Sequence, residues 1–187
     1  MNSRKDSFRY GKSQLISRAN VLESLSSDSP ATIKQLAART RLSTPTVTKA
    51  LSQLEELGLV SSKGHRDQPK GRKPALYGAS EEHYWLGIDL EIPDLRIAVY
   101  DLSKRLIKSK KDFIYLEEET DDVDTEFPRN LNQKIKEFLD QQEISPDSIL
   151  GVGAGVPGMV SQGKFRPFSR LKNPPVIPIK EPLETEL

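Results

Sequence analysis

The chain has 187 residues, of which 28 are Lys or Arg, 27 are Asp or Glu and none is Cys. This length allows one domain or two small ones, and the lack of Cys excludes disulfides and thiolate zinc sites and is typical of the cytoplasm. No run of roughly 18 apolar residues is present, and residues 1–14 lack the apolar middle of a signal peptide. The sequence therefore predicts a cytoplasmic protein without a membrane span.

Charge is distributed unevenly along the chain. Residues 1–80 carry 14 Lys and Arg residues against 6 Asp and Glu, whereas residues 81–187 carry 14 against 21. A basic segment favours a polyanionic partner such as a nucleic acid, and an acidic segment does not. We therefore expect two domains with different purposes, of which the first binds the polyanion.

Two helices are predicted over residues 12–39. Apolar residues follow helical spacing over residues 12–27, and the sequence at 28–30 (DSP) then stops the pattern. Thr32 and Gln35 have the spacing of a capping box, in which each side chain bonds the backbone N–H of the other residue. The residues predicted to face inward are Leu15, Ile16, Ala19, Leu22 and Leu25 in the first helix, and Ile33, Leu36 and Ala37 in the second.

A third helix is predicted to follow a turn at residues 40–43. Thr44 is expected to cap this helix, with Pro45 at the first helical position, where the missing N–H costs nothing. Gly58 is expected to end it, because glycine commonly adopts the left-handed conformation there. The buried stripe is predicted to be Val47, Leu51, Leu54 and Leu57.

A basic hairpin is predicted next. Residues 59–62 and 75–77 are strand-like, and residues 63–73 between them are rich in Gly, Lys and Arg. The order helix, helix, turn, helix, hairpin over residues 12–79 indicates a winged helix-turn-helix, which is a DNA-binding fold.

The third helix and the hairpin supply the candidate DNA contacts. The polar face of a docked helix is free to enter the major groove, and glycine with basic residues suits a narrow minor groove. The candidates are Ser43, Thr44, Thr46, Thr48, Lys49 and Gln53 in the helix, and Lys63, His65, Arg66, Lys70, Arg72 and Lys73 in the hairpin. The alternatives are that the helix start is only a good cap and that the hairpin is only a solvated linker.

The pattern changes after Ser80. Strand-like runs over residues 84–90, 95–102 and 105–116 predict an antiparallel meander. Residues 117–126 hold seven acids in ten and lack the spacing and glycine of a calcium loop, so they predict a solvated loop.

One helix, at residues 131–139, and one strand, at 148–156, are predicted beyond that loop, with irregular chain over residues 159–187. The aromatic residues expected in the core are Trp85, Phe113, Tyr115 and Phe138. Because only one clear helix follows the meander, we expect exposed apolar surface within residues 84–160, either covered by a second copy or loosely ordered.

Several segments of the chain resemble the transcriptional regulators of the ROK family, which groups bacterial repressors with sugar kinases. The segments are residues 42–49 (LSTPTVTK), 57–60 (LGLV), 71–77 (GRKPALY), 86–90 (LGIDL), 151–158 (GVGAGVPG) and 173–184. The resemblance implies an α+β chain, with an N-terminal winged helix-turn-helix and a partial actin-like, ribonuclease-H-like α/β lobe that senses sugars. We expect a flexible arm at 1–11, the winged helix at 12–79 and the partial lobe at 80–187.

Two departures from the family pattern bear on enzyme activity. Family kinases have a glycine-rich phosphate turn after the first-strand Asp, and Asp89 and Arg96 match that pattern, but Glu91 and Ile92 replace the glycines and Pro93 removes an amide donor. The chain also ends before the family's sugar-contacting Asn-Asp motif, its His/Cys zinc site and its second lobe. We therefore expect no enzyme activity, no cofactor and no bound metal.

The sequence thus predicts a sequence-specific DNA-binding transcriptional regulator, a repressor of carbohydrate-related genes that binds double-stranded DNA as a homo-oligomer, expected to be a dimer. The resemblance implies a sugar or sugar-phosphate inducer, for which only the turn with Gly155, Pro157 and Gly158 is a candidate contact, and a tight strand-end turn is the simpler interpretation. Two alternatives stay open: the first lobe of a ROK-type sugar kinase, and a truncated interaction protein that acts through full-length paralogues.

Overall fold

The computed structural model describes residues 12–65, 73–116, 122–168 and 174–186. The chain divides into two compact units, Met1–Glu81 and Glu82–Leu187, which we call the first and the second unit. The expected arm at residues 1–11 lies outside the described residues. No helix within the described ranges combines the length and the apolar composition that crossing a bilayer requires.

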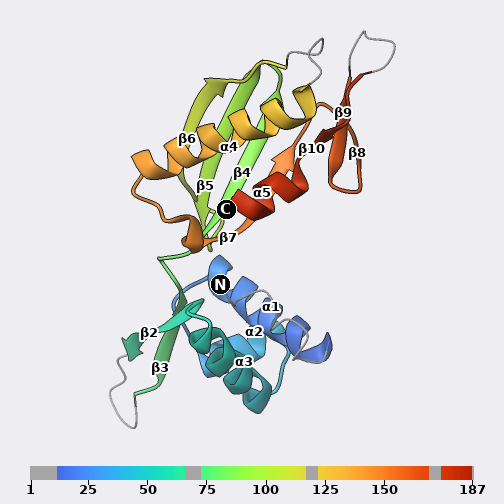
Figure 1. Cartoon of the computed structure of the whole chain (residues 1–187). Coiled ribbons are helices and arrows are strands. Elements are labelled where there is room, and N and C mark those ends of the chain that lie inside the picture. Colours follow the sequence, from blue (N-terminus) through green and yellow to red (C-terminus); the bar gives the residue numbers. More distant parts are fainter. Residues whose placement is uncertain (1–11, 66–72, 117–121, 169–173, 187) are drawn as a thin grey trace. The chain divides into compact units, whose positions relative to one another are not determined.

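The first unit packs helices against a small antiparallel sheet (Figure 1). The sheet has the order β1-β3-β2, and β2 and β3 form the expected hairpin, which extends away from the helices. The elements are α1 (Lys12–Ser27), β1 (Ala31–Thr32), α2 (Ile33–Thr40), α3 (Thr44–Glu56), β2 (Val60–His65) and β3 (Ala75–Ala79). The sequence analysis did not predict β1, which pairs with β3 and makes it the central strand.

The buried face of α1 differs from the prediction. Val21 and Leu25 are fully buried in the core of the first unit, whereas Leu15 and Ile16 are 40% and 52% exposed, and Ala19 is exposed as well. The predicted stripe was therefore wrong at its first three positions. Apolar residues lie on more than one side of α1, so packing against the other helices, and not the spacing alone, decides which side is buried.

The start of α2 is as predicted. The Gln35 backbone N–H donates to Thr32 Oγ1 over 3.3 Å, and the Thr32 backbone N–H donates to Gln35 Oε1 over 2.9 Å. This reciprocal pair satisfies two backbone donors that a helix start would otherwise leave open. Leu36 is fully buried, and Ile33 and Ala37 pack beside it.

The second unit is built on a larger sheet with the order β6-β5-β4-β7. The expected antiparallel meander is present, and β7 returns parallel to β4 after the helix α4 (Figure 1). Its elements are β4 (Tyr84–Glu91), β5 (Asp94–Asp101), β6 (Leu106–Phe113), α4 (Val123–Gln141), a short 3₁₀ helix (Pro146–Ser148), β7 (Ile149–Gly155), β8 (Gly158–Ser161), β9 (Lys164–Pro167), β10 (Ile177–Pro178) and α5 (Lys180–Glu186).

Two predictions in this unit were too cautious. The helix expected at 131–139 begins at Val123, so Asp124 and Glu126 belong to its first turn and not to a loop. Acidic side chains are favourable there because the positive end of the helix dipole lies at the start. Residues 159–187 were expected to be irregular, but their described parts form the strands β8, β9 and β10, in the order β10-β9-β8, and the helix α5.

One face of the larger sheet carries the core of this unit. Leu86, Ile88 and Ile97 are buried there with Ile135 and Phe138 of α4, which lies across this face (Figure 1). The opposite face carries Trp85, which is 38% exposed and whose ring lies 3.2 Å from the position that a Cβ of Gly151 would take. The glycine therefore gives the ring room over β7.

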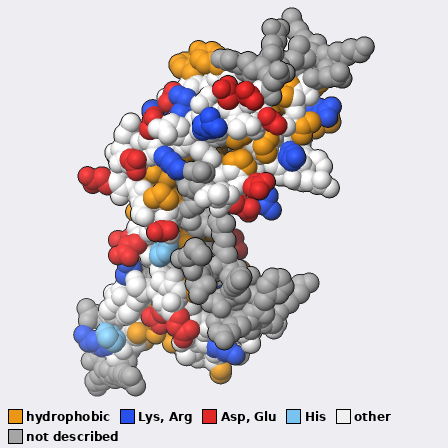
Figure 2. Space-filling view, in the orientation of Figure 1, with side chains coloured by type: hydrophobic (Ala, Val, Ile, Leu, Met, Phe, Trp, Pro, Cys, Tyr) orange, Lys and Arg blue, Asp and Glu red, His pale blue; other side chains and the backbone are white. Residues whose placement is uncertain are grey.

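Exposed apolar side chains are numerous in the second unit, as the sequence predicted for residues 84–160 (Figure 2). Of the four aromatic residues expected in the core, only Phe138 is buried; Phe113 and Tyr115 are 56% and 68% exposed, and Trp85 lies on the open face. These three were wrongly placed in the core: Trp85 lies on the face of the sheet opposite α4, and Phe113 ends the edge strand β6. Other exposed residues are Leu106, Ile107, Leu150, Val152, Met159 and Val160.

Asp112 joins the edge strand β6 to α4. Its carboxylate accepts the Phe113 backbone N–H over 2.8 Å, and Lys134 of α4 and Lys110 of β6 each lie 3.1 Å from it. The Phe113 N–H and the two ammonium groups lower the pKa of Asp112 from 3.8 to about 2, although partial burial opposes this. The ionised carboxylate is thus stabilised in the folded state.

We expect Asp112→Asn to lower the free energy of unfolding by about 1–2 kcal/mol at pH 7. Because the folded-state pKa is depressed, this contribution is present above about pH 4 and is lost as the pH falls toward about 2. Urea unfolding followed by circular dichroism at several pH values measures it. Asp140→Asn, at an exposed position of α4, is the control, and an Asp112→Asn effect that persists unchanged at the lowest pH would contradict the assignment.

Candidate nucleic-acid interface

Ser43 caps α3. Its Oγ accepts the Thr46 backbone N–H over 3.3 Å, and Thr44 is already the first residue of the helix. The expectation that Thr44 is the cap was therefore wrong by one residue. Pro45 lies in the first turn as expected, where its missing N–H leaves no hydrogen bond unmade.

The buried stripe of α3 fixes which side of the helix faces outward. Val47, Leu51 and Leu54 are almost completely buried, as predicted, and Ala50 is buried with them. Leu57, predicted to belong to the stripe, is 52% exposed because it is the C-cap, and Gly58 follows it with a φ of 71°. The exposed side carries Thr44, Pro45, Thr48, Lys49, Ser52, Gln53 and Glu56, which line a shallow surface depression.

The predicted contact residues of α3 differ in how free their side chains are. Thr46 is half-buried, and its hydroxyl forms a 2.8 Å hydrogen bond with that of Ser43; the Thr48 hydroxyl donates to the Thr44 carbonyl over 2.9 Å. The side chains of Lys49 and Gln53 have no hydrogen-bond or ion-pair partner among the described residues. The side chains of Lys49 and Gln53 are therefore available to a ligand.

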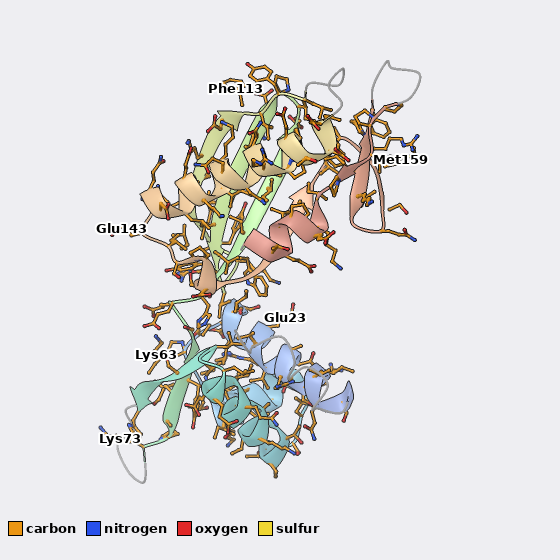
Figure 3. The ribbon with its side chains drawn as sticks, viewed as in Figure 1. Glu23, Lys63, Lys73, Phe113, Glu143 and Met159 are labelled. Atoms are coloured by element: carbon orange, nitrogen blue, oxygen red, sulfur yellow. The ribbon has the colours of Figure 1, made fainter. Side chains whose placement is uncertain are left out.

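The described part of the hairpin carries His65 at the end of β2 and Lys73 shortly before β3. Gly64 has a φ of 90° and nothing within 4 Å of an added Cβ, and His65 ends β2 opposite Ala75. Figure 2 shows a histidine next to a Lys or Arg side chain in this part of the unit, where Figure 3 labels Lys73. The predicted contacts Arg66, Lys70 and Arg72 lie outside the described residues.

Lys63, also a predicted DNA contact, has a partner within the protein. Its Nζ lies 2.8 Å from Glu81 Oε1, and its stem passes over Gly78, where an added Cβ would lie 2.8 Å from Lys63 Cγ. This lysine therefore ties β2 to the residue at which the first unit ends.

A hollow of about 950 Å³ separates the start of α3 from the hairpin. It is lined by Thr32, Ile33, Lys34, Gln35, Ala38, Thr44, His65, Lys73, Pro74, Ala75 and Tyr77. The sequence analysis gave no role to Lys34 or Tyr77. A lysine ammonium group and a tyrosine hydroxyl can both bind a polyanion. The sequence did not indicate that they lie together, because only the fold brings the first turn of α2 next to β3.

The candidate sugar-contacting turn at the end of β7 is closely packed. A Cβ on Gly158 would lie 2.1 Å from the Arg166 carbonyl oxygen, so no larger residue fits. The Gly158 N–H donates to the Val156 carbonyl over 2.9 Å, and Pro157 has no N–H. Among the described residues, these two positions therefore leave no free backbone donor for a hydroxyl group.

The turn between β4 and β5 is a tight one. Glu91 and Asp94 face each other across the ladder, and Ile92 and Pro93 connect them through a cis peptide bond. Asp89 and Arg96 are the residues that match the kinase pattern. Arg96 Nη1 lies 3.8 Å from Asp89 Oδ2, and both side chains are about half exposed. The two carboxylates give this turn a negative charge.

Comparisons with known proteins agree with this geometry. Residues 17–62 match the family described as bacterial regulatory protein, arsR family. The xylose repressor of Bacillus subtilis (strain 168) is 23% identical over 154 residues, which is 82% of this chain and 39% of the repressor. The crystal structure of a ROK family transcriptional regulator, a homolog of the E. coli MLC protein, matches with a TM-score of 0.57 and 21% identity, over 80% of this chain and 38% of that chain.

The fold of the chain is similar to that of this ROK family transcriptional regulator. The expected α+β class is confirmed, with the predicted helices and hairpin followed by a second unit built on a four-stranded sheet. The chain spans about two fifths of the length of both relatives. A putative sugar kinase from Cytophaga hutchinsonii also matches, at 24% identity over 56% of this chain and 33% of the kinase, with a TM-score of 0.40.

The cap of α3 gives a first test of this interface. We expect Ser43→Ala to lower the free energy of unfolding by about 1 kcal/mol, because the Thr46 N–H loses its acceptor. Ser43→Asp keeps an acceptor and is expected to retain most of the stability. Thermal unfolding followed by circular dichroism measures both, with Ser52→Ala on the exposed side of α3 as control. Equal stability of Ser43→Ala and the control would exclude Ser43 as the cap.

Proposed function

We propose that the chain is a sequence-specific DNA-binding regulator, a repressor of carbohydrate-related genes. The observation that carries the proposal is the exposed polar face of α3, held outward by its buried stripe and flanked by a basic hairpin. The likeness to the xylose repressor and to a ROK family regulator supports it. A DNA-binding protein of this kind acts in the cytoplasm, which is the location we propose.

We propose that α3 enters the major groove and the hairpin the adjacent minor groove. Lys49 and Gln53 suit base edges, since lysine pairs with guanine and glutamine with adenine, and Thr44 and Thr48 suit phosphates at the helix start. Ser43 and Thr46 support the helix start through their mutual hydrogen bond. In the hairpin, His65, Arg66, Lys70, Arg72 and Lys73 supply the basic contacts, and Lys63 positions the hairpin through Glu81.

A homodimer is the assembly we propose, with residues 12–79 as the DNA-binding domain and residues 80–187 as the assembly and response domain. One α3 reads a short half-site, so two copies spaced about one helical turn apart give the specificity that an operator needs. The exposed apolar side chains of the second unit supply a surface that a second copy can cover.

An inducer of the sugar or sugar-phosphate class would relieve repression by binding the DNA-free state more tightly than the DNA-bound state. The turn at Gly155, Pro157 and Gly158 is not a complete site for such a ligand. The Gly158 N–H already donates to the Val156 carbonyl, and Pro157 has no N–H to donate. Any pocket for the inducer therefore has to include further residues.

The primary test is fluorescence anisotropy with DNA from upstream of the chain's own gene and with a scrambled duplex. We expect selective binding whose log K falls by about 0.9 per neutralised phosphate for each tenfold increase in salt. The molar mass of the chain, measured by light scattering after size exclusion, is expected to be that of a dimer. Equal affinity for both duplexes would contradict the regulator function, and a monomer that binds only when mixed with a longer relative would favour the interaction-protein alternative.

Base reading by α3 is tested with Gln53→Ala. We expect this variant to change the preference among single-base variants of the preferred duplex, with a discrimination loss of about 1–3 kcal/mol at one position, because a bidentate contact to adenine is removed. Gln133→Ala, the same chemical change in α4, is the control. A uniform loss of affinity across all duplexes would instead make Gln53 a phosphate contact.

The sugar kinase alternative is tested by ADP formation from ATP with a panel of sugars. We expect no sugar-dependent turnover, because Glu91 and Asp94 flank a turn of two residues in which Pro93 offers no amide donor. A sugar-dependent ADP-forming activity that copurifies with the chain would overturn the non-enzyme interpretation.

A further inference from the structure

The geometry points to a binding site for the DNA phosphodiester backbone in the hollow between α2, the start of α3 and the hairpin, with Lys34 and Tyr77 as phosphate-binding residues. This inference rests on the proposed function, which it deepens. Neither residue belongs to the face of α3 or to the hairpin loop from which DNA contacts were predicted. Their role is to position the protein on the duplex and not to read its sequence.

The position of the hollow follows from the shape of B-DNA. A major groove and the neighbouring minor groove are separated by one phosphodiester backbone. A protein that places a helix in one groove and a hairpin in the next must therefore straddle that backbone. The hollow is bounded by Thr44 at the first turn of α3 and by His65, Lys73 and Ala75 of the hairpin, which is where the backbone has to pass.

The chemistry of the lining suits a polyanion. Lys34, Lys73 and His65 supply basic groups, Thr44 and Tyr77 supply hydroxyl groups, and no Asp or Glu is among the described residues that line the hollow. Lys34 is exposed in the first turn of α2, and its ammonium group forms no ion pair with any described residue. Lys34 can therefore bind a phosphate without losing an ion pair within the protein. The release of a condensed counterion from the DNA favours that contact.

Tyr77 is held in place before DNA arrives. It lies in β3 and pairs with Ala31 of β1 on one side and with Ser62 of β2 on the other, so its backbone is fixed from both sides. Its half-buried ring packs against the core of the first unit, and within the described residues its hydroxyl has no hydrogen-bond partner. A tyrosine hydroxyl that loses no freedom on binding donates to a phosphate oxygen at low entropic cost.

The two residues make different contributions, and this separates them experimentally. Lys34 neutralises a phosphate, so its removal changes the salt dependence of binding. Tyr77 donates one hydrogen bond without a change in charge, so its removal weakens binding at every salt concentration by the same factor. Neither contact depends on the bases, so both effects are equal on preferred and scrambled duplexes.

The test compares Lys34→Gln and Tyr77→Phe with Lys108→Gln and Tyr100→Phe, the same two changes in β6 and β5 of the second unit. Affinities of the full chain for the preferred and the scrambled duplex are measured by anisotropy over a salt series. We expect Lys34→Gln to reduce the slope of log K against log salt by about 0.9. We expect Tyr77→Phe to weaken binding about threefold to tenfold with the slope unchanged. Both control variants are expected to bind like the unchanged chain.

The outcomes separate this inference from the proposed function. If the unchanged chain fails to bind DNA, the proposed function is wrong, and this inference falls with it. If it binds but Lys34→Gln and Tyr77→Phe match their controls, the backbone passes elsewhere and only this inference is overturned. A change in sequence preference in either variant would also overturn it, since it would show a base contact. Because Lys34 is exposed, its variant keeps the test decisive even if Tyr77→Phe disturbs the fold.

Discussion

The burial of one stripe of α3 is the constraint on which the rest of the first unit depends. Val47, Leu51 and Leu54 pack into a common core with Val21 and Leu25 of α1. An α-helix turns by about 100° per residue, so a slip of one position would rotate a different set of side chains toward the core. Polar groups would then be buried without partners, at a cost of about 1–3 kcal/mol each. The packing thus sets the rotation of the helix, and with it the polar face offered to DNA.

The first unit was largely predictable because its boundaries are marked by local chemistry. The pair Thr32 and Gln35 marks the start of α2, and Gly58 follows the end of α3. The cap of α3 was misplaced by one residue because Ser43 and Thr44 both carry a hydroxyl acceptor, and spacing alone does not choose between them. The buried side of α1 and the short strand β1 depend on neighbours that are distant in the sequence, so no local pattern indicates them.

In the second unit, the strands were predictable from their alternation, but the coverage of the sheet was not. Trp85 was assigned to the core because an aromatic residue in a strand is most often buried, yet it lies on the face opposite α4. The start of α4 was missed because acids and a proline, Pro128, resemble a loop when the helix dipole is ignored. Lys34 and Tyr77 escaped notice for a related reason: a hollow between a helix and a hairpin exists only once both are folded.

The edge strand β6 has a consequence for how the protein behaves at high concentration. An edge strand presents unpaired backbone groups that can join the sheet of another molecule and start aggregation. Here Leu106, Ile107 and Phe113 are exposed on that strand, and Lys108, Lys110 and Lys111 lie between them. Mutual repulsion of these ammonium groups disfavours the stacking of identical edges. At 0.1 M salt the screening length for such repulsion is about 10 Å. The colloidal stability of the chain therefore depends on ionic strength, as does its proposed affinity for DNA.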